Sequence, residues 1–143
     1  MFPGSYTDLE SKAESTVRRV ARIMVVDDEP DTVMTLLELL RSEGYQAGGF
    51  GSGGAALDNI AAFDPDVIIS DIAMPFLNGW DVARVVREKM GERRPVLIAI
   101  SGRFTKGSDK LLAQMKGFNY YLTKPCEPSA LLALLKPLAA NLG

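Results

Sequence analysis

The feature that most constrains the fold is a regular alternation of short apolar runs with longer amphipathic stretches. Five runs are rich in β-branched and aromatic residues, which favours strands; they cover 23–26, 45–50, 67–69, 96–100 and 120–122. Helix-like stretches follow them at 30–41, 54–63, 79–90, 108–116 and from 129 onward. Five strand–helix units in a row predict an α/β fold. Because such crossovers are right-handed, we expect a parallel sheet with helices on both faces, a doubly wound arrangement.

Composition limits what this chain can do. Its 143 residues fit one domain, which we assign to residues 21–143, with 1–20 as a solvated tail or short helix. The absence of histidine and the single cysteine exclude histidine-ligated metals, histidine-dependent triads and multi-cysteine zinc sites. A net charge of −2 argues against nucleic-acid binding. No apolar run approaches the roughly 20 residues of a membrane span, and no secretory signal is visible, so we expect a cytoplasmic protein without a membrane partner.

Polar residues stand at the carboxyl ends of four of the expected strands. They are Asp27, Asp28, Asp71, Ser101 and Lys124, and Gly102 follows Ser101. Ligands of open parallel sheets bind beyond the carboxyl ends of the strands, so we expect these groups to meet at one site. Each also has a plainer interpretation: an aspartate capping the helix near Pro30, a loop acid, a turn serine, a surface lysine. Their convergence on one edge favours the site.

The three acids imply a bound cation. Carboxylates about 4 Å apart repel by roughly 4 kcal/mol per pair at an effective dielectric near 20. An all-oxygen ligand set suits Mg²⁺, which also binds phosphate oxygens. With Lys124 supplying a second positive charge, an ionised aspartate can act as a nucleophile toward phosphorus. Ser101 can donate its hydroxyl to a phosphoryl oxygen.

These motifs resemble the receiver domain of two-component response regulators. The matching strings are 25–30 (VVDDEP), 71–75 (DIAMP) with Gly79, 101–102 (SG) and 124–125 (KP). Spacings of 43, 30 and 23 residues separate Asp28, Asp71, Ser101 and Lys124. The resemblance extends from about residue 22 to about residue 138. It implies a flavodoxin-like fold with strand order 2-1-3-4-5, of the single-domain type found in chemotaxis regulators and without an output domain.

The resemblance implies a role for each acid. Asp71 would accept a phosphoryl group from a phosphohistidine on a sensor histidine kinase or a histidine phosphotransfer protein. Mg²⁺, the implied cofactor, would be held by Asp28, Asp71 and the backbone carbonyl of Ala73, with Asp27 acting through a water. The chain would be no enzyme toward other substrates, but a phosphoacceptor that catalyses its own phosphotransfer and dephosphorylation.

The resemblance also implies a switch. Lys124 would pair with the phosphoryl group, Ser101 and Gly102 would help to bind it, and Ser101 would move toward it. Tyr121 would turn inward behind Ser101, although a strand tyrosine can equally be a packing residue. The movement would reshape the face made by the fourth helix, fifth strand and fifth helix, where a downstream protein would bind.

Some positions differ from the usual pattern of that family. Ala73 and Arg103 occupy positions that border the phosphoryl group and influence its lifetime, and we expect Arg103 to limit or steer attacking water. Leu132 lies off the main apolar stripe of the last helix, and we expect Pro137 to kink that helix. An exposed apolar strip there makes a homodimer a further candidate.

Three alternatives stay open. The first is that the chain is a receiver fragment of a larger hybrid kinase or transcription regulator. The second is that it is a constitutive interaction module that is not phosphorylated. The intact acids, Ser101 and Lys124 argue against the second. An aspartate-nucleophile phosphatase is the third, but its Asp-x-Asp motif does not match the adjacent Asp27 and Asp28. The sequence names neither the kinase, the target nor the phosphoryl lifetime.

Overall fold

Strands and helices alternate along the chain in the order that the sequence predicts. The computed structural model describes residues 19–92, 94–102, 113–114 and 116–142. Its elements are β1 (Arg22–Val26), α2 (Pro30–Ser42), β2 (Gln46–Phe50), α3 (Gly53–Phe63), β3 (Val67–Asp71), α4 (Gly79–Met90), β4 (Val96–Ser101), β5 (Tyr120–Thr123) and α6 (Pro128–Ala140). The helix expected at 108–116 and the tail expected at 1–20 lie largely outside the described residues. None of the helices described is long and apolar enough to cross a bilayer.

The sheet has the predicted topology. Its strands lie in the order β2-β1-β3-β4-β5, and all four neighbouring pairs are parallel. The register sets Val26 beside Ser70, Asp71 beside Ile100, and Ser101 beside Thr123. The strands β3 and β4 extend beyond their apolar runs, so that Asp71 and Ser101 are their last residues. The carboxyl ends of the central strands therefore reach one edge together.

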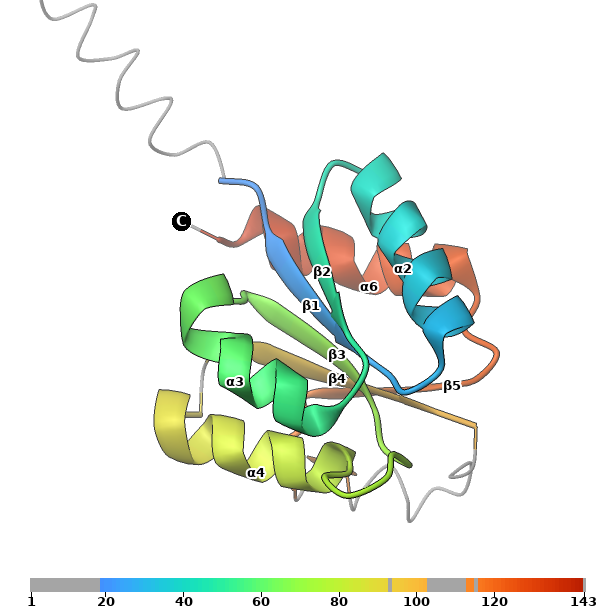
Figure 1. The fold of residues 1–143 in the computed structure, drawn as a ribbon. Coiled ribbons are helices and arrows are strands. Elements are labelled where there is room, and N and C mark those ends of the chain that lie inside the picture. Colours follow the sequence, from blue (N-terminus) through green and yellow to red (C-terminus); the bar gives the residue numbers. More distant parts are fainter. Residues whose placement is uncertain (1–18, 93, 103–112, 115, 143) are drawn as a thin grey trace, which may run out of the picture.

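Helices cover both faces of the sheet (Figure 1). On one face α3 and α4 pack on a cluster that includes Met24 and Val26, and on the other α2 and α6 pack on one that includes Ile23 and Val25. Alternate residues of β1 thus enter opposite clusters, as a strand covered on both sides requires. Each such apolar side chain contributes roughly 1.5–3 kcal/mol on full burial. The doubly wound α/β architecture is confirmed.

The edge strand β2 contains two glycines that let its neighbours pack on the backbone. A Cβ on Gly49 would lie 2.3 Å from Val33 Cγ1, and one on Gly48 would lie 2.7 Å from the ring of Phe63. Side chains at these positions would push α2 and the end of α3 away from the strand. This packing explains why the apolar signal of β2 is weaker than that of the central strands.

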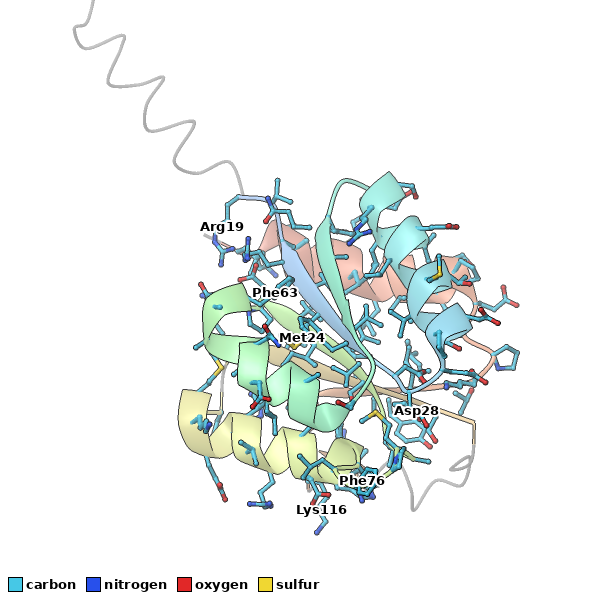
Figure 2. The ribbon with its side chains drawn as sticks, in the orientation of Figure 1. Arg19, Met24, Asp28, Phe63, Phe76 and Lys116 are labelled. Atoms are coloured by element: carbon cyan, nitrogen blue, oxygen red, sulfur yellow. The ribbon has the colours of Figure 1, made fainter. Side chains whose placement is uncertain are left out.

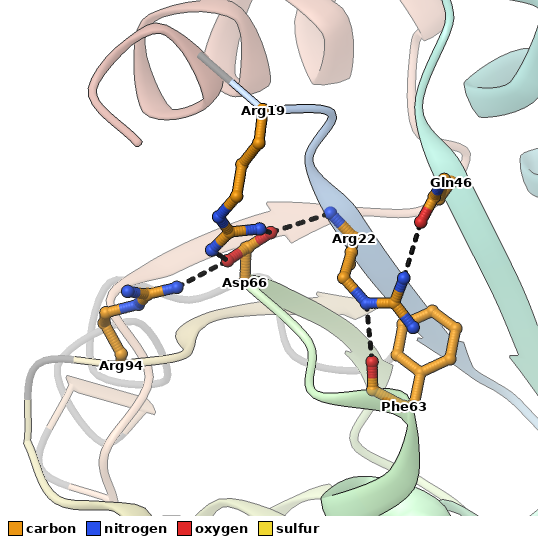
Figure 3. Close-up of polar contacts among 6 residues, drawn as sticks. All are labelled: Arg19, Arg22, Gln46, Phe63, Asp66 and Arg94. Atoms are coloured by element: carbon orange, nitrogen blue, oxygen red, sulfur yellow. Dashed lines mark hydrogen bonds and ion pairs between the residues drawn. The ribbon is translucent and has the colours of Figure 1, made fainter. Parts of the chain in front are cut away.

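A buried carboxylate joins β1, β3 and β4 at the amino end of the sheet (Figure 3). Asp66 accepts hydrogen bonds from the Arg19 guanidinium, from Arg94 at 2.5 Å and from the backbone N–H of Arg22 at 2.8 Å. Burial alone would raise the pKa of Asp66. The hydrogen bonds from Arg19 and Arg22 and the charges of Arg19 and Arg94 outweigh it, so the pKa is lowered.

We expect Asp66→Asn to lower the free energy of unfolding at neutral pH by about 1–3 kcal/mol, because two guanidiniums lose their shared charge partner. The folded-state pKa lies below the ordinary 3.8. The ionised form therefore stabilises the fold above pH 3.8, and this contribution is lost as the pH falls through the folded-state pKa. Urea unfolding at neutral and acidic pH measures it, with the exposed Asp58→Asn as control. If the free energy of unfolding of Asp66→Asn differed from that of the natural chain by as much at acidic pH as at neutral pH, the explanation would be wrong.

Candidate functional site

The carboxyl edge of the sheet brings three acids together. Asp27 and Asp28 follow β1, and Asp71 ends β3. One carboxylate oxygen from each of the three residues lies within 4.8 Å of the corresponding oxygens of the other two. Asp27 and Asp71 are only 4% and 8% exposed, whereas Asp28 is exposed to solvent. The convergence expected from the sequence is present, and two of its three charges are buried.

Lys124 joins the two buried acids. It follows β5, and its Nζ donates to Asp27 Oδ2 at 2.9 Å and to Asp71 Oδ2 at 3.2 Å. The Lys124–Pro125 peptide bond is cis. The ion pairs connect residues 97 and 53 positions apart in the sequence, so they form only when β1, β3 and β5 are aligned in one sheet.

The second oxygen of each buried acid is held by backbone. Asp27 Oδ1 accepts the N–H of Glu29 at 3.0 Å, and Asp71 Oδ1 accepts the N–H of Ala73 at 3.3 Å. The N-cap residue of α2 is Glu29, which makes no side-chain capping bond. The capping alternative for Asp27 and Asp28 is therefore wrong. The loops after β1 and β3 instead aim the buried carboxylates toward Lys124.

A shallow hollow of about 350 Å³ opens beside this cluster. Its lining adds Glu29, Ala73, Ser101 and Gly102 to the three acids and Lys124. Ser101 is fully buried, and a Cβ on Gly102 would lie 3.4 Å from Lys124 Cβ. At about 30 Å³ per water, the hollow has room for a small hydrated anion or cation. The four strand ends singled out from the sequence thus line one space.

Gly79 fixes the loop that carries Asp71. A Cβ on Gly79 would lie 2.5 Å from the Asp71 carbonyl oxygen and 2.7 Å from Ile72 Cα, both backbone atoms that cannot yield cheaply. The N–H of Gly79 donates to Ile72 O at 2.8 Å. Asn78 and Asp81 then form a capping box that begins α4. The chain therefore returns closely to the end of β3 before α4 starts.

The electrostatics of the cluster are unbalanced toward negative charge. Two carboxylates at this separation repel by about 3–4 kcal/mol at an effective dielectric near 20. Burial raises the pKa of Asp27, and the charge of Asp71 adds to this, while Lys124 and the N–H of Glu29 oppose it. Burial would lower the pKa of Lys124, but its contacts with Asp27 and Asp71 outweigh this and raise it. Among the residues that the structure describes, Lys124 is the one cation that lines this hollow with the three acids, so a further cation would relieve the repulsion.

The remaining predicted site residues are less defined. Tyr121 is partly buried and packs against the cluster beneath α3 and α4, which fits both the packing and the switch interpretation. Arg103 lies outside the described residues, and so does most of the expected fourth helix. Leu132 is partly buried, and α6 continues through Pro137 to Ala140. The roles proposed for Tyr121 and Arg103 stay predictions.

Sequence reasoning missed three residues. Glu29 contributes its N–H to Asp27, which its place beside the paired acids could have suggested. Asp66 binds Arg19 and Arg22 at the beginning of β1 and Arg94 just before β4, and its place directly before a buried strand was its only signal in the sequence. Phe76 is fully exposed with φ of 65° in the loop after β3. No sequence pattern predicted that Phe76 is exposed, because a short loop has no hydrophobic periodicity.

We expect Lys124→Met to lower the free energy of unfolding at neutral pH by about 2–3 kcal/mol, because Asp27 and Asp71 lose their shared partner. Adding Asp27→Asn should recover most of this loss. The raised pKa of Lys124 means that the charged lysine stabilises the fold below pH 10.5, and that this contribution disappears as the pH rises through the folded-state pKa. Urea unfolding tests both effects, with the exposed Lys136→Met as control. Failure of the second substitution to restore stability would contradict the charge explanation.

Known proteins resemble this chain over most of its length. MtrA, a DNA-binding response regulator of Mycolicibacterium smegmatis, is 35% identical over 115 residues, which are 80% of this chain and 49% of MtrA. The chain thus spans about half the length of that relative. Protein PilH of Pseudomonas aeruginosa is 31% identical over 122 residues, which are 85% of this chain and 100% of PilH.

Solved structures agree with the sequence relatives. Chemotaxis protein CheY4 of Vibrio cholerae matches with a TM-score of 0.77 at 26% identity, over 84% of this chain and 99% of CheY4. The family model described as the response regulator receiver domain matches residues 23–136. With the strand order 2-1-3-4-5 and the acid cluster at its carboxyl edge, this match shows that the chain belongs to the response regulator receiver domain family.

Proposed function

We propose that this receiver accepts a phosphoryl group on Asp71 and thereby changes a protein-binding surface. The observation that carries the proposal is the position of Asp71, whose Oδ2 lies 3.2 Å from Lys124 Nζ beside two further acids. An ionised carboxylate at the mouth of a small hollow can attack phosphorus, and a neighbouring ammonium can receive the charge of the transferred group. The donor is a phosphohistidine on a sensor kinase or a histidine phosphotransfer protein.

The transfer exchanges one phosphorus bond for another. A carboxylate oxygen of Asp71 forms the new P–O bond while the P–N bond of the phosphohistidine breaks. The electron pair of that bond stays on the imidazole nitrogen, which takes up a proton from water. Lys124 already bonds Asp71 Oδ2 and can shift to a phosphoryl oxygen. In dephosphorylation a water oxygen forms the new P–O bond while the P–O bond to Asp71 breaks; the electron pair stays on the carboxylate, and the proton of the attacking water passes to solvent.

The residues present fit Mg²⁺. Three carboxylates within 4.8 Å offer only oxygen donors, and their charge exceeds what Lys124 balances. Asp28, Asp71 and the carbonyl of Ala73 would hold the ion, with Asp27 acting through a water. When bound, Mg²⁺ neutralises charge on the phosphoryl oxygens. Asp28 is the accessible acid of the cluster, which suits an ion that keeps several waters.

The switch is supported by what surrounds the hollow. Ser101 and Gly102 line it, and the added phosphate brings about −1.5 to −2 charges with strong acceptors beside them. We propose that Ser101 moves toward the phosphoryl group and that Tyr121 follows, so that the surface around β5 and α6 changes for a downstream partner. Ala73 and Arg103 are proposed to adjust the phosphoryl lifetime. A homodimer through α6 stays a prediction, and so does the cytoplasmic location.

A constitutive interaction module is the second candidate function. In that case the acid cluster would be a remnant, and neither phosphorylation nor Mg²⁺ binding would occur. The chain would equally serve as the receiver segment of a larger regulator, since it matches all of PilH but half of MtrA. The two experiments below separate the phosphorylated receiver from the constitutive module.

We expect acetyl phosphate with Mg²⁺ to add a single phosphoryl group to the natural chain, and none to Asp71→Ala. Asp71 is buried, bonds Lys124 and lines the hollow, as Asp27 also does, and the resemblance to receiver domains assigns the phosphoryl group to Asp71. Intact-protein mass spectrometry measures the addition, with the exposed Asp58→Ala as control. A group that persists in Asp71→Ala would exclude Asp71 as acceptor. No addition, together with no Mg²⁺ binding, would favour the constitutive module.

We expect Asp28→Asn to have opposite effects with and without Mg²⁺. Without the ion the variant should be as stable as the natural chain or slightly more stable, because a like charge is removed from the cluster. With Mg²⁺ at about ten times its dissociation constant, the natural chain should gain about 1.4 kcal/mol and the variant much less. Thermal unfolding measures stability, and the single tryptophan, Trp80, which shares a hollow with Asp28, reports binding. Asp31→Asn, on the exposed first turn of α2, is the control. An equal Mg²⁺ response in Asp28→Asn would contradict the proposed ligand set.

A further inference from the structure

Phe76 has no packing role in the described structure. It is 100% exposed, whereas the other exposed large apolar residues of the described chain are 37–59% exposed. Those residues keep about half of their surface in contact with the protein. Phe76 exposes all of its side chain, so burial against the described part of the chain does not explain an aromatic residue at this position.

The loop holds Phe76 outward at a conformational cost. Its φ of 65° lies in the left-handed region, which glycine and asparagine adopt far more readily than phenylalanine. Met74 on one side is buried, with its N–H bonded to Ile72 O at 3.1 Å. On the other side the Leu77 carbonyl oxygen lies 2.7 Å from where a Cβ of Gly53 would be. The loop is thus packed on both sides, and Phe76 is displayed on a fixed backbone. Unexplained strain of this kind points to a functional role.

Phe76 stands on the rim of the phosphoacceptor site. It follows Asp71 by five residues, in the loop whose Ala73 N–H bonds that acid. Figure 2 shows Phe76 and Asp28 at the same end of the molecule, where the strands end. A hollow of about 400 Å³ on this rim is lined by Asp28, Ala73 and apolar side chains that include Met74, Pro75 and Trp80. This hollow shares Asp28 and Ala73 with the hollow of the acid cluster, so the loop that bears Phe76 adjoins the site.

The burial of Asp71 indicates which kind of protein binds at this rim. A protein donor must bring phosphorus to a carboxylate that is only 8% exposed, so its surface must cover the rim. A downstream target or a second copy has no such requirement. The exposed acids Asp28 and Glu29 line the hollow of the acid cluster and favour a basic donor surface. Resting on the proposed function, we propose that Phe76 anchors the phosphohistidine-bearing protein by entering an apolar recess beside its histidine.

This anchor contributes only when the donor is a protein. A rigid, exposed aromatic side chain that becomes buried on association is typical of residues that dominate an interface. Phosphoramidate carries the same P–N bond as a phosphohistidine but no protein surface. Phe76 should therefore affect transfer from a protein and leave transfer from phosphoramidate unchanged.

The test compares these two donors on Phe76→Asn, because asparagine adopts the left-handed backbone and keeps the loop. The histidine kinases and phosphotransfer proteins of the source genome are loaded with radioactive phosphate, and the one that phosphorylates the natural chain fastest serves as protein donor. We expect Phe76→Asn to raise KM for this donor by at least about tenfold with little change in kcat, and Phe76→Tyr to retain the natural KM. Met90→Gln removes an exposed apolar residue at the far end of α4 and should change neither reaction.

Three results would overturn the anchor. Transfer from the protein donor at the natural KM in Phe76→Asn would exclude it. Equal slowing with phosphoramidate and with the protein donor would instead give Phe76 a structural role at the hollow. Phosphorylation by phosphoramidate without transfer from any of the kinases or phosphotransfer proteins would exclude a protein donor. Failure of phosphoramidate on the natural chain, with no Mg²⁺ binding, would overturn the proposed function itself.

Discussion

The bridge from Lys124 to Asp27 and Asp71 is the interaction on which the site depends. It joins the carboxyl ends of β1 and β3 to the segment after β5, residues that meet only when the whole sheet is formed. The parallel register makes the bridge possible, because every strand ends at the same edge. Backbone N–H groups of Glu29 and Ala73 hold the other two oxygens, so each buried carboxylate is oriented from both sides. The position and the charge of Asp71 are thereby fixed together.

The buried aspartates at the two ends of the sheet lie in opposite electrostatic environments. At the amino end, Asp66 faces two guanidiniums and a backbone N–H, and its pKa is lowered. At the carboxyl end, burial and the neighbouring acid raise the pKa of Asp27 even beside Lys124. At the amino end the charge of Asp66 is balanced, and its hydrogen bonds hold neighbouring strands together. The arrangement at the carboxyl end leaves negative charge unbalanced in a small hollow, which is typical of a site that binds a cation and performs chemistry.

The loop after β3 packs against the domain on its inner side and exposes Phe76 on its outer side. Inward, Gly79 allows the chain to return within contact of the Asp71 backbone, and Met74 and Leu77 pack against the domain. Outward, the same packing leaves Phe76 exposed in a left-handed conformation. A loop held this firmly gives Asp71 a constant environment and gives an approaching protein a constant surface. Both properties come from packing on either side of a few residues, and neither needs a regular element.

The sequence by itself determined the α/β class, the five strands within a few residues, and the group of residues at the strand ends. Uninterrupted apolar runs indicate strands buried on both faces, and parallel connection then brings Asp27, Asp71, Ser101 and Lys124 to one edge. Only the tertiary structure decided which oxygen bonds which donor, that neither Asp27 nor Asp28 caps α2, and that Asp66 is surrounded by arginines. It also decided that Phe76 faces water. These outcomes depend on side-chain distances between segments far apart in the chain, which local propensity and periodicity do not contain.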